Sequence, residues 1–259
     1  MRSRIYLSNA TTTRGLSGKL TYGIPLAYRL AKKYKLAGVE LLLSWFPWTQ
    51  GWRNHLSNLE LALHLPWSYR FDPWGWNHEA SISANIVGKA AYLSQAGTGR
   101  VLKIGEILEL KYQVIHPGAF AKCLPIPLTE LKAIKNLAFE NDWNPLGYKG
   151  IEAAIRFADL AEGRIVVDIT HMARVPEDAS CAIKMIDAIG DRLVAVHVSD
   201  YDEMLGEHLV PIWGQERYKN LPRILDRVRS WNPGAAMVGE ILKGDPEEDV
   251  EGLIAYVEH

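Results

Sequence analysis

The chain repeats one pattern along its length: a short run of apolar, often β-branched residues, a polar residue at the end of that run, a loop, and then a stretch with helical spacing. The clearest copy is RIVVDITH at residues 164–171. Its Ile-Val-Val run predicts a buried strand, Asp168 ends that strand, and His171 follows three residues later. A single Asp-x-x-His match arises easily by chance. The prediction of a metal or catalytic site therefore depends on the repetition of the pattern along the chain.

Eight copies of the pattern can be followed through the sequence. Strands are predicted at residues 4–10, 38–44, 59–66, 112–118, 136–142, 164–168, 193–200 and 235–241. Helices are predicted at residues 24–35, 79–95, 127–135, 148–161, 176–189, 217–231 and 247–258, while residues 97–111 fit either a hairpin or a loop insertion. Strict alternation predicts a parallel sheet, and eight units predict closure into a single (β/α)8 TIM barrel over residues 1–259.

Composition narrows the class of protein. No Pro/Ser/Gly-rich tract or charge block suggests a linker between domains, so one α/β domain is expected. The net charge of −1 lacks the basic excess of a chain that grips nucleic acid, although a local basic patch stays open. Cys123 and Cys181 are far apart and are expected to be free thiols in a reducing compartment. The first ten residues lack an apolar signal core and no run is long enough for a membrane span, so we expect a cytoplasmic protein.

Ionisable residues stand at the ends of six predicted strands. They are His64, His116, Glu140, Asp168, His197 and Glu240. Catalytic groups of a TIM barrel come from the C-terminal ends of several strands, so these six side chains are expected to converge on one mouth. His171 and His208 follow two of the strands and are expected in loops at the same mouth.

So much ionisable chemistry in one cavity is costly unless a cation pairs it. Any one of the histidines alone would be read as a hydrogen-bonded structural residue. Jointly, imidazoles and carboxylates without thiolate predict one to three divalent ions, with Zn²⁺ or Mn²⁺ favoured and Mg²⁺, Co²⁺ or Fe²⁺ left open. Glu140, Asp168, His197 and Glu240 would complete one site. His64 and His116 would allow a second ion, and His171 and His208 either a third ion or contacts with substrate.

Two aromatic clusters are predicted on loops at the same mouth. They include Trp45 and Trp48 after the second strand and Trp67 after the third. Each cluster fits a packed rim or a dimer face as well as a stacking wall for a sugar, so a homo-oligomer stays open. Arg174, in a loop on the same side, is a candidate for binding an anionic group of a substrate.

The sequence resembles the xylose isomerase-like TIM-barrel superfamily, which includes sugar-phosphate isomerases and epimerases and the endonuclease IV type of AP endonuclease. The resemblance covers nearly the whole chain and rests on motifs in a characteristic order: HLP at 64–66, HPG at 116–118, FEND at 139–142, DITH at 168–171, HVSD at 197–200, EHLVPIWGQ at 207–215 and GE at 239–240.

The resemblance implies a set of site residues. Glu140, Asp168, His197 and Glu240 match the metal ligands shared by the isomerases, the epimerases and the nuclease. His64 and His116 match the two extra histidines of the multi-zinc nuclease, and His171 and His208 match two ligands of its third zinc. This sequence departs from the nuclease at the remaining third-zinc ligand, an aspartate that is Gly206 here, where Glu207 or Asp202 could substitute.

Two mechanisms remain open. In an isomerase or epimerase acting on a sugar, sugar phosphate or keto acid, a metal polarises the carbonyl and Glu140 and Glu240 move the proton, with His171 or His208 hydrogen-bonding the substrate oxygens. In a phosphodiester hydrolase of the AP-endonuclease type, Glu140 would bridge two metals and the partner would be nucleic acid. The near-neutral charge and the tryptophans favour a small carbohydrate-like substrate, while the surplus histidines favour the hydrolase.

Overall fold

The computed structural model describes residues 4–9, 20–42, 56, 58–64, 109–116, 132–141, 148–173, 179–241 and 244–259. Several sequence predictions lie outside these residues: the helix at 79–95, most of the helix at 127–135, Cys123, and the candidate substrate residues Trp45, Trp48, Trp67 and Arg174.

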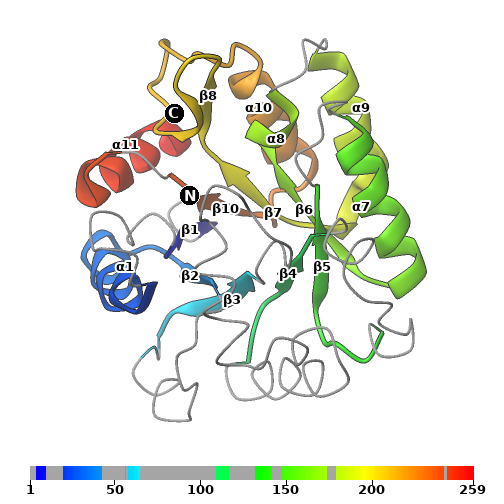
Figure 1. Ribbon diagram of the computed structural model, residues 1–259, viewed down its shortest axis with the longest axis horizontal. Helices are drawn as coiled ribbons and strands as arrows, with labels where there is room; N and C mark the ends of the chain where they lie inside the picture. The colour runs from blue at the N-terminus through cyan, green and yellow to red at the C-terminus, as the bar shows by residue number, and fades with distance from the viewer. Residues whose placement is uncertain are drawn as a thin grey trace, which may run out of the picture.

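Eight parallel strands close into a barrel, as the sequence predicts. The strands are β1 (Ile5–Ser8), β2 (Gly38–Leu42), β3 (Glu60–His64), β4 (Gln113–Ile115), β5 (Leu137–Glu140), β6 (Arg164–Asp168), β7 (Leu193–Val198) and β10 (Ala236–Gly239). Their order around the barrel is β1-β10-β7-β6-β5-β4-β3-β2, so β1 pairs with both β2 and β10 and closes the ring (Figure 1).

The longer described helices lie around the outside of the barrel (Figure 1). They are α1 (Leu20–Tyr34), α7 (Tyr148–Ala161), α9 (Ala179–Ile189), α10 (Leu221–Trp231) and α11 (Pro246–Glu258), each within a few residues of its predicted range. The start of α11 shows how local sequence sets a boundary: the Asp245 carboxylate accepts the backbone N–H groups of Glu247 and Glu248. None of the described helices is long and apolar enough to cross a membrane.

Two segments predicted as loops contain regular structure instead. A short helix, α8 (Ile169–Ala173), follows β6 directly. It begins there because Asp168 Oδ1 accepts the N–H groups of Thr170 and His171. The loop expected around His208 is an antiparallel hairpin of β8 (Asp200–Asp202) and β9 (Gly206–Leu209). Its turn is closed by Asp202 Oδ1, which accepts the backbone N–H groups of residues 204 and 205.

Side chains of the strands alternate between two apolar layers. One set packs between the barrel and the helices. The other set fills the barrel interior: Tyr6, Ala62, Tyr112, Val114, Ala138, Val166, Ala195, Ala236 and Val238. Because the strand repeat is two residues, the next inward positions toward the C-terminal ends are His64, His116, Glu140, Asp168, His197 and Glu240. The alternation therefore aims these side chains at the barrel mouth.

Candidate metal centre

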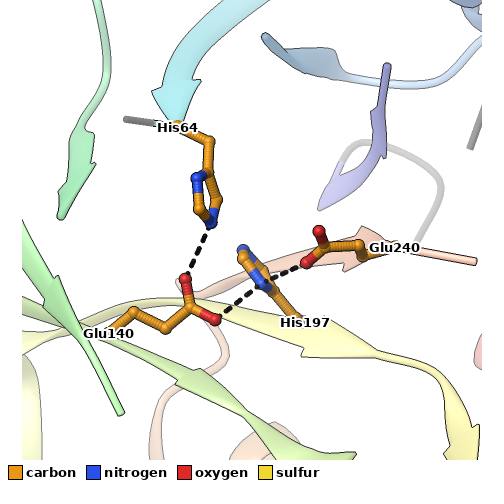
Figure 2. A group of neighbouring side chains, drawn as sticks. All are labelled: His64, Glu140, His197 and Glu240. Carbon is orange, nitrogen blue, oxygen red and sulfur yellow. Dashed lines mark hydrogen bonds and ion pairs between the residues drawn. The ribbon is translucent and has the colours of Figure 1, made fainter. Parts of the chain in front are cut away.

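The six strand-end residues meet at the C-terminal mouth of the barrel. His64, His116, Glu140, Asp168 and His197 are buried, and 12% of the Glu240 side chain is exposed. Figure 2 shows His64, Glu140, His197 and Glu240, which come from or directly follow β3, β5, β7 and β10 and point toward one another. Donor atoms of these four side chains all lie within 4.8 Å of one another.

The two oxygens of Glu140 face different histidines. Oε2 lies 2.9 Å from His64 Nε2 and 3.5 Å from His116 Nε2. Oε1 lies 3.3 Å from His197 Nδ1 and 3.7 Å from His171 Nδ1. One carboxylate therefore lies between His64 at the end of β3 and His197 on β7 (Figure 2).

His197 Nδ1 lies among three carboxylates. It is 2.8 Å from Glu240 Oε2, 3.3 Å from Glu140 Oε1 and 3.9 Å from Asp168 Oδ2. Despite these short distances, neither His197 Nδ1 nor Asp168 Oδ2 makes a hydrogen bond of acceptable geometry within the described part of the chain. Two buried ligand atoms that share a centre and lack a hydrogen bond are what a divalent cation would satisfy, so the residues fit a metal ion.

The electrostatics of the cluster favour a cation at the same place. Burial alone would raise the pKa of Glu140, but the His197 and His116 imidazoles hold it well below its usual range. Burial would likewise raise the pKa of Glu240, and His197 lowers it instead. Burial would lower the pKa of His64, but the hydrogen bond and charge of Glu140 raise it to about 9. The cluster thus attracts positive charge, whether protons or a metal ion.

A second group of possible ligands lies beside the first. Donor atoms of Asp168, His171 and His208 also lie within 4.8 Å of one another. His171 Nδ1 lies 2.7 Å from the carbonyl oxygen of Asn141, and His208 Nδ1 lies 3.0 Å from that of Glu240. If each Nδ1–H donates to its carbonyl, Nε2 is the unprotonated nitrogen of each neutral ring and can bind a metal ion.

The hairpin of β8 and β9 determines where His208 and Asp202, two candidates for the third-zinc site, are placed. His208 lies on β9 with a φ of 62°, rather than in a loop. Asp202, considered as a substitute for the aspartate that Gly206 replaces, holds the hairpin turn and lies 3.8 Å from Arg217 Nε through its other oxygen. The carboxylate beside His171 and His208 is Asp168.

Sequence reasoning missed two buried polar residues that hold the site. Asn141 clamps the end of β6: its Nδ2 donates to the Asp168 carbonyl at 2.9 Å, and its Oδ1 accepts the Asp168 N–H at 2.7 Å. Glu40 on β2 is fully buried and lies 3.2 Å from His197 Nε2. The sequence contains a signal for this residue, because Glu40 is a charged residue at an inward position of the otherwise apolar run GVELLLS.

Comparison with solved structures places the fold in a known architecture. A xylose isomerase-like TIM barrel protein from Mycobacterium smegmatis, in complex with magnesium, aligns with a TM-score of 0.58 at 10% identity, over 98% of this chain and 95% of its own. Endonuclease IV from Thermus thermophilus aligns with a TM-score of 0.57 at 15% identity over 98% of both chains. The 3-keto-D-glucoside 4-epimerase of E. coli aligns with a TM-score of 0.53 at 14% identity, over 90% of this chain and 92% of its own.

No protein-family model matches the sequence, and no curated protein matches it. The similarity to known proteins is therefore seen in the fold. The chain has the fold of the xylose isomerase-like TIM barrels.

Proposed function

We propose that this chain is a divalent-metal-dependent isomerase or epimerase acting on a small carbohydrate-like substrate, such as a sugar, sugar phosphate or keto acid. The observation that supports this function best is the pair of glutamates around one histidine nitrogen. Glu140 and Glu240 both approach His197 Nδ1, at 3.3 and 2.8 Å (Figure 2). Two carboxylates beside a bound substrate can remove a proton and return one.

The proposed roles follow from position. His197, Glu140, Asp168 and Glu240 would hold the ion, with His64 near enough to join them. A bound divalent ion supplies Lewis acidity, which polarises a substrate carbonyl and acidifies the neighbouring C–H. One glutamate takes the proton from that carbon and the other delivers a proton to the adjacent position or the opposite face. His171 and His208 would hydrogen-bond the substrate oxygens.

The remaining candidates for substrate binding are Trp45, Trp48, Trp67 and Arg174, and they keep the roles that the sequence suggests: a stacking wall and an anion contact. The fold is shared with an E. coli 3-keto-D-glucoside 4-epimerase and with a protein solved with magnesium, which supports this class of substrate and cofactor. We propose Zn²⁺ or Mn²⁺ as the preferred ions, with Mg²⁺, Co²⁺ and Fe²⁺ to be compared.

The test is proton exchange at carbon. The metal-loaded chain is incubated in D₂O with a panel of ketoses, aldoses, their phosphates and keto acids, and NMR follows both deuterium incorporation and new isomers. The proposal expects incorporation next to a carbonyl in at least one substrate, and loss of the signal when a chelator is added. A panel without exchange in any metal-loaded form would contradict it.

One observation favours a second candidate, a metal-dependent phosphodiester hydrolase. Glu140 Oε2 faces His64 and His116 while Oε1 faces His197, which is an arrangement suited to a carboxylate between two ions. The group formed by Asp168, His171 and His208 would extend it. Hydrolysis of abasic DNA or of a simple phosphodiester by the zinc-loaded chain, without proton exchange on sugars, would select this candidate. Because a nuclease binds phosphates through cationic residues, its DNA affinity should then fall steeply with salt.

A further inference from the structure

Glu40 lies one step deeper in the barrel than the candidate metal ligands. In the register of the sheet it pairs with Ala62 of β3, two residues before His64, and with Ser8 of β1. Its side chain is fully buried. Burying a carboxyl group at such a place is costly, so the groups that it contacts indicate its role.

Among the described residues, two groups contact the Glu40 carboxylate. His197 Nε2 lies 3.2 Å from Oε1 and 3.3 Å from Oε2. The Tyr112 hydroxyl donates to Oε2 at 3.0 Å. Within the described part of the chain, no lysine or arginine pairs with Glu40. The Glu40 carboxylate therefore contacts the Nε2 side of the His197 ring, whereas Glu140 and Glu240 contact its Nδ1 side.

The orientation of His197 decides which of its nitrogens can bind an ion. A neutral imidazole carries one proton, and the nitrogen that donates to a neighbour leaves the other with its lone pair. At His197, the nitrogen beside Glu40 is Nε2, and the nitrogen among Glu140, Glu240 and Asp168 is Nδ1.

We infer that Glu40 is a positioning residue of the metal centre: it accepts the Nε2–H of His197 and thereby holds this ring with Nδ1 as the metal-binding nitrogen. The inference rests on the metal centre of the proposed function. Tyr112 completes the arrangement, because its hydroxyl holds the carboxylate, and its ring stacks on Tyr6 at a centroid distance of 6.4 Å. A carboxylate behind a ligand histidine also raises the basicity of that ligand, and removing such a partner typically costs about 10–100-fold in metal affinity.

The experiment measures metal affinity in substituted chains. Chelated protein is titrated with Zn²⁺ and with Co²⁺ against a chromophoric chelator, and the visible spectrum of the Co²⁺ form is recorded. Three variants are compared with the unsubstituted chain: Glu40→Ala, Glu40→Gln and Tyr112→Phe. The matched control is Glu60→Gln on β3, which removes another tyrosine-bonded glutamate, at the opposite end of the barrel.

Glu40→Ala should lose about 10–100-fold in affinity and shift the Co²⁺ spectrum, because both the orientation and the charge behind His197 are lost. Glu40→Gln should recover part of the loss, since its amide oxygen can still accept the Nε2–H. Tyr112→Phe should lose less than Glu40→Ala, and Glu60→Gln should match the unsubstituted chain.

A structural role alone would lower the melting temperature of the metal-free Glu40 variants and leave affinity and spectrum unchanged, and that result would overturn the inference. If Glu40→Ala does not fold, the near-isosteric Glu40→Gln decides the matter by the same two readouts. Failure of the unsubstituted chain to bind either ion would overturn the metal centre itself. Normal binding by the unsubstituted chain and by every Glu40 variant would overturn only the role of Glu40.

Discussion

The two ends of the barrel hold ionisable groups in contrasting environments. At the N-terminal end, the Tyr6 hydroxyl donates to Glu60, and Lys111 Nζ lies 2.8 Å from Glu60 Oε1. The Glu60 side chain is 46% exposed, so water also solvates it. At the C-terminal end, four carboxylates surround His197, namely those of Glu40, Glu140, Asp168 and Glu240. In the described part of the chain, no lysine or arginine pairs with these four carboxylates.

This contrast shows at which end of the barrel the charges are balanced by the protein and solvent alone. A carboxylate paired with a lysine and wetted by solvent needs nothing further, and its net contribution to stability is small. Buried carboxylates around imidazoles need positive charge, which protons or a metal ion can supply. We therefore attribute the C-terminal end to metal binding, and the N-terminal end serves as an internal control.

The largest effect is expected on turnover. Glu140→Gln and Glu240→Gln each remove one carboxylate of the proposed proton transfer and should lower kcat roughly 10²–10⁴-fold. Glu60→Gln should leave kcat unchanged, because Glu60 lies at the other end of the barrel. The measurement is steady-state kinetics on the substrate that the exchange panel identifies. Equal kcat values in the two site variants and in the Glu60→Gln control would contradict the assignment of catalysis to the C-terminal end.

The next effect is on stability. A metal present at about 1,000 times its Kd should stabilise the folded chain by about 4 kcal/mol, because it binds the folded site and not the unfolded chain. Thermal unfolding with and without chelator measures this difference. Glu60→Gln should show the same chelator-induced drop as the unsubstituted chain, whereas Glu140→Ala should show a much smaller one. A chelator that leaves the unsubstituted chain unaffected would argue that protons alone satisfy the carboxylates.

Metal affinity should depend on pH. The carboxylates raise the pKa of His64 to about 9 and that of His197 well above its usual range, so the metal-free cluster holds protons at neutral pH. An incoming ion must displace them, and affinity should fall as the pH is lowered from about 8 to about 5. Competition titrations across this range test the sign. A flat profile would indicate that the imidazoles are not ligands.

A smaller effect concerns the amide that holds the end of β6. Asn141→Ala removes both side-chain hydrogen bonds to the buried backbone of Asp168 and should cost about 1–3 kcal/mol in the free energy of unfolding. Asn232→Ala is the matched control, since its amide also bonds two backbone groups, those of Leu193 and Gly234, but near the surface. Urea denaturation should show the smaller loss for Asn232→Ala. The reverse order would contradict the importance of the Asn141 clamp.

The smallest effect is expected at the N-terminal end. Glu60→Gln weakens a half-exposed ion pair with Lys111 and should cost no more than about 1 kcal/mol. Urea denaturation of the metal-free chain measures it. A loss of several kcal/mol in the free energy of unfolding would mean that the stability of the N-terminal end also depends on the charge of Glu60. The two ends of the barrel would then differ less in their electrostatics than the distances indicate.

The sequence predicts the barrel well because its strands alternate strictly with helices. The run from residues 164 to 168 became β6 with the expected ends, and Tyr148–Ala161 became α7. The meeting of His64, Glu140 and His197 follows from strand ends sharing one face. Their role as metal ligands stays a prediction.

The sequence could not predict features that depend on tertiary contacts. The α8 helix is five residues long and is started by Asp168, a residue assigned only to ligand chemistry. The hairpin that carries His208 has no alternating apolar pattern. Glu40 stands in a run that is otherwise typical of a buried strand, and only its inward parity, two residues after Gly38, marks it as a buried carboxylate.

The most direct test of this account is the metal content per chain. Protein is purified without chelator or an affinity-tag metal, and elemental analysis is compared between the unsubstituted chain and the Glu60→Gln and Glu140→Ala variants. The account predicts at least one equivalent of divalent metal in the first two and a marked loss in Glu140→Ala. A chain that contains no divalent metal, and takes up none when it is offered, would contradict the central claim.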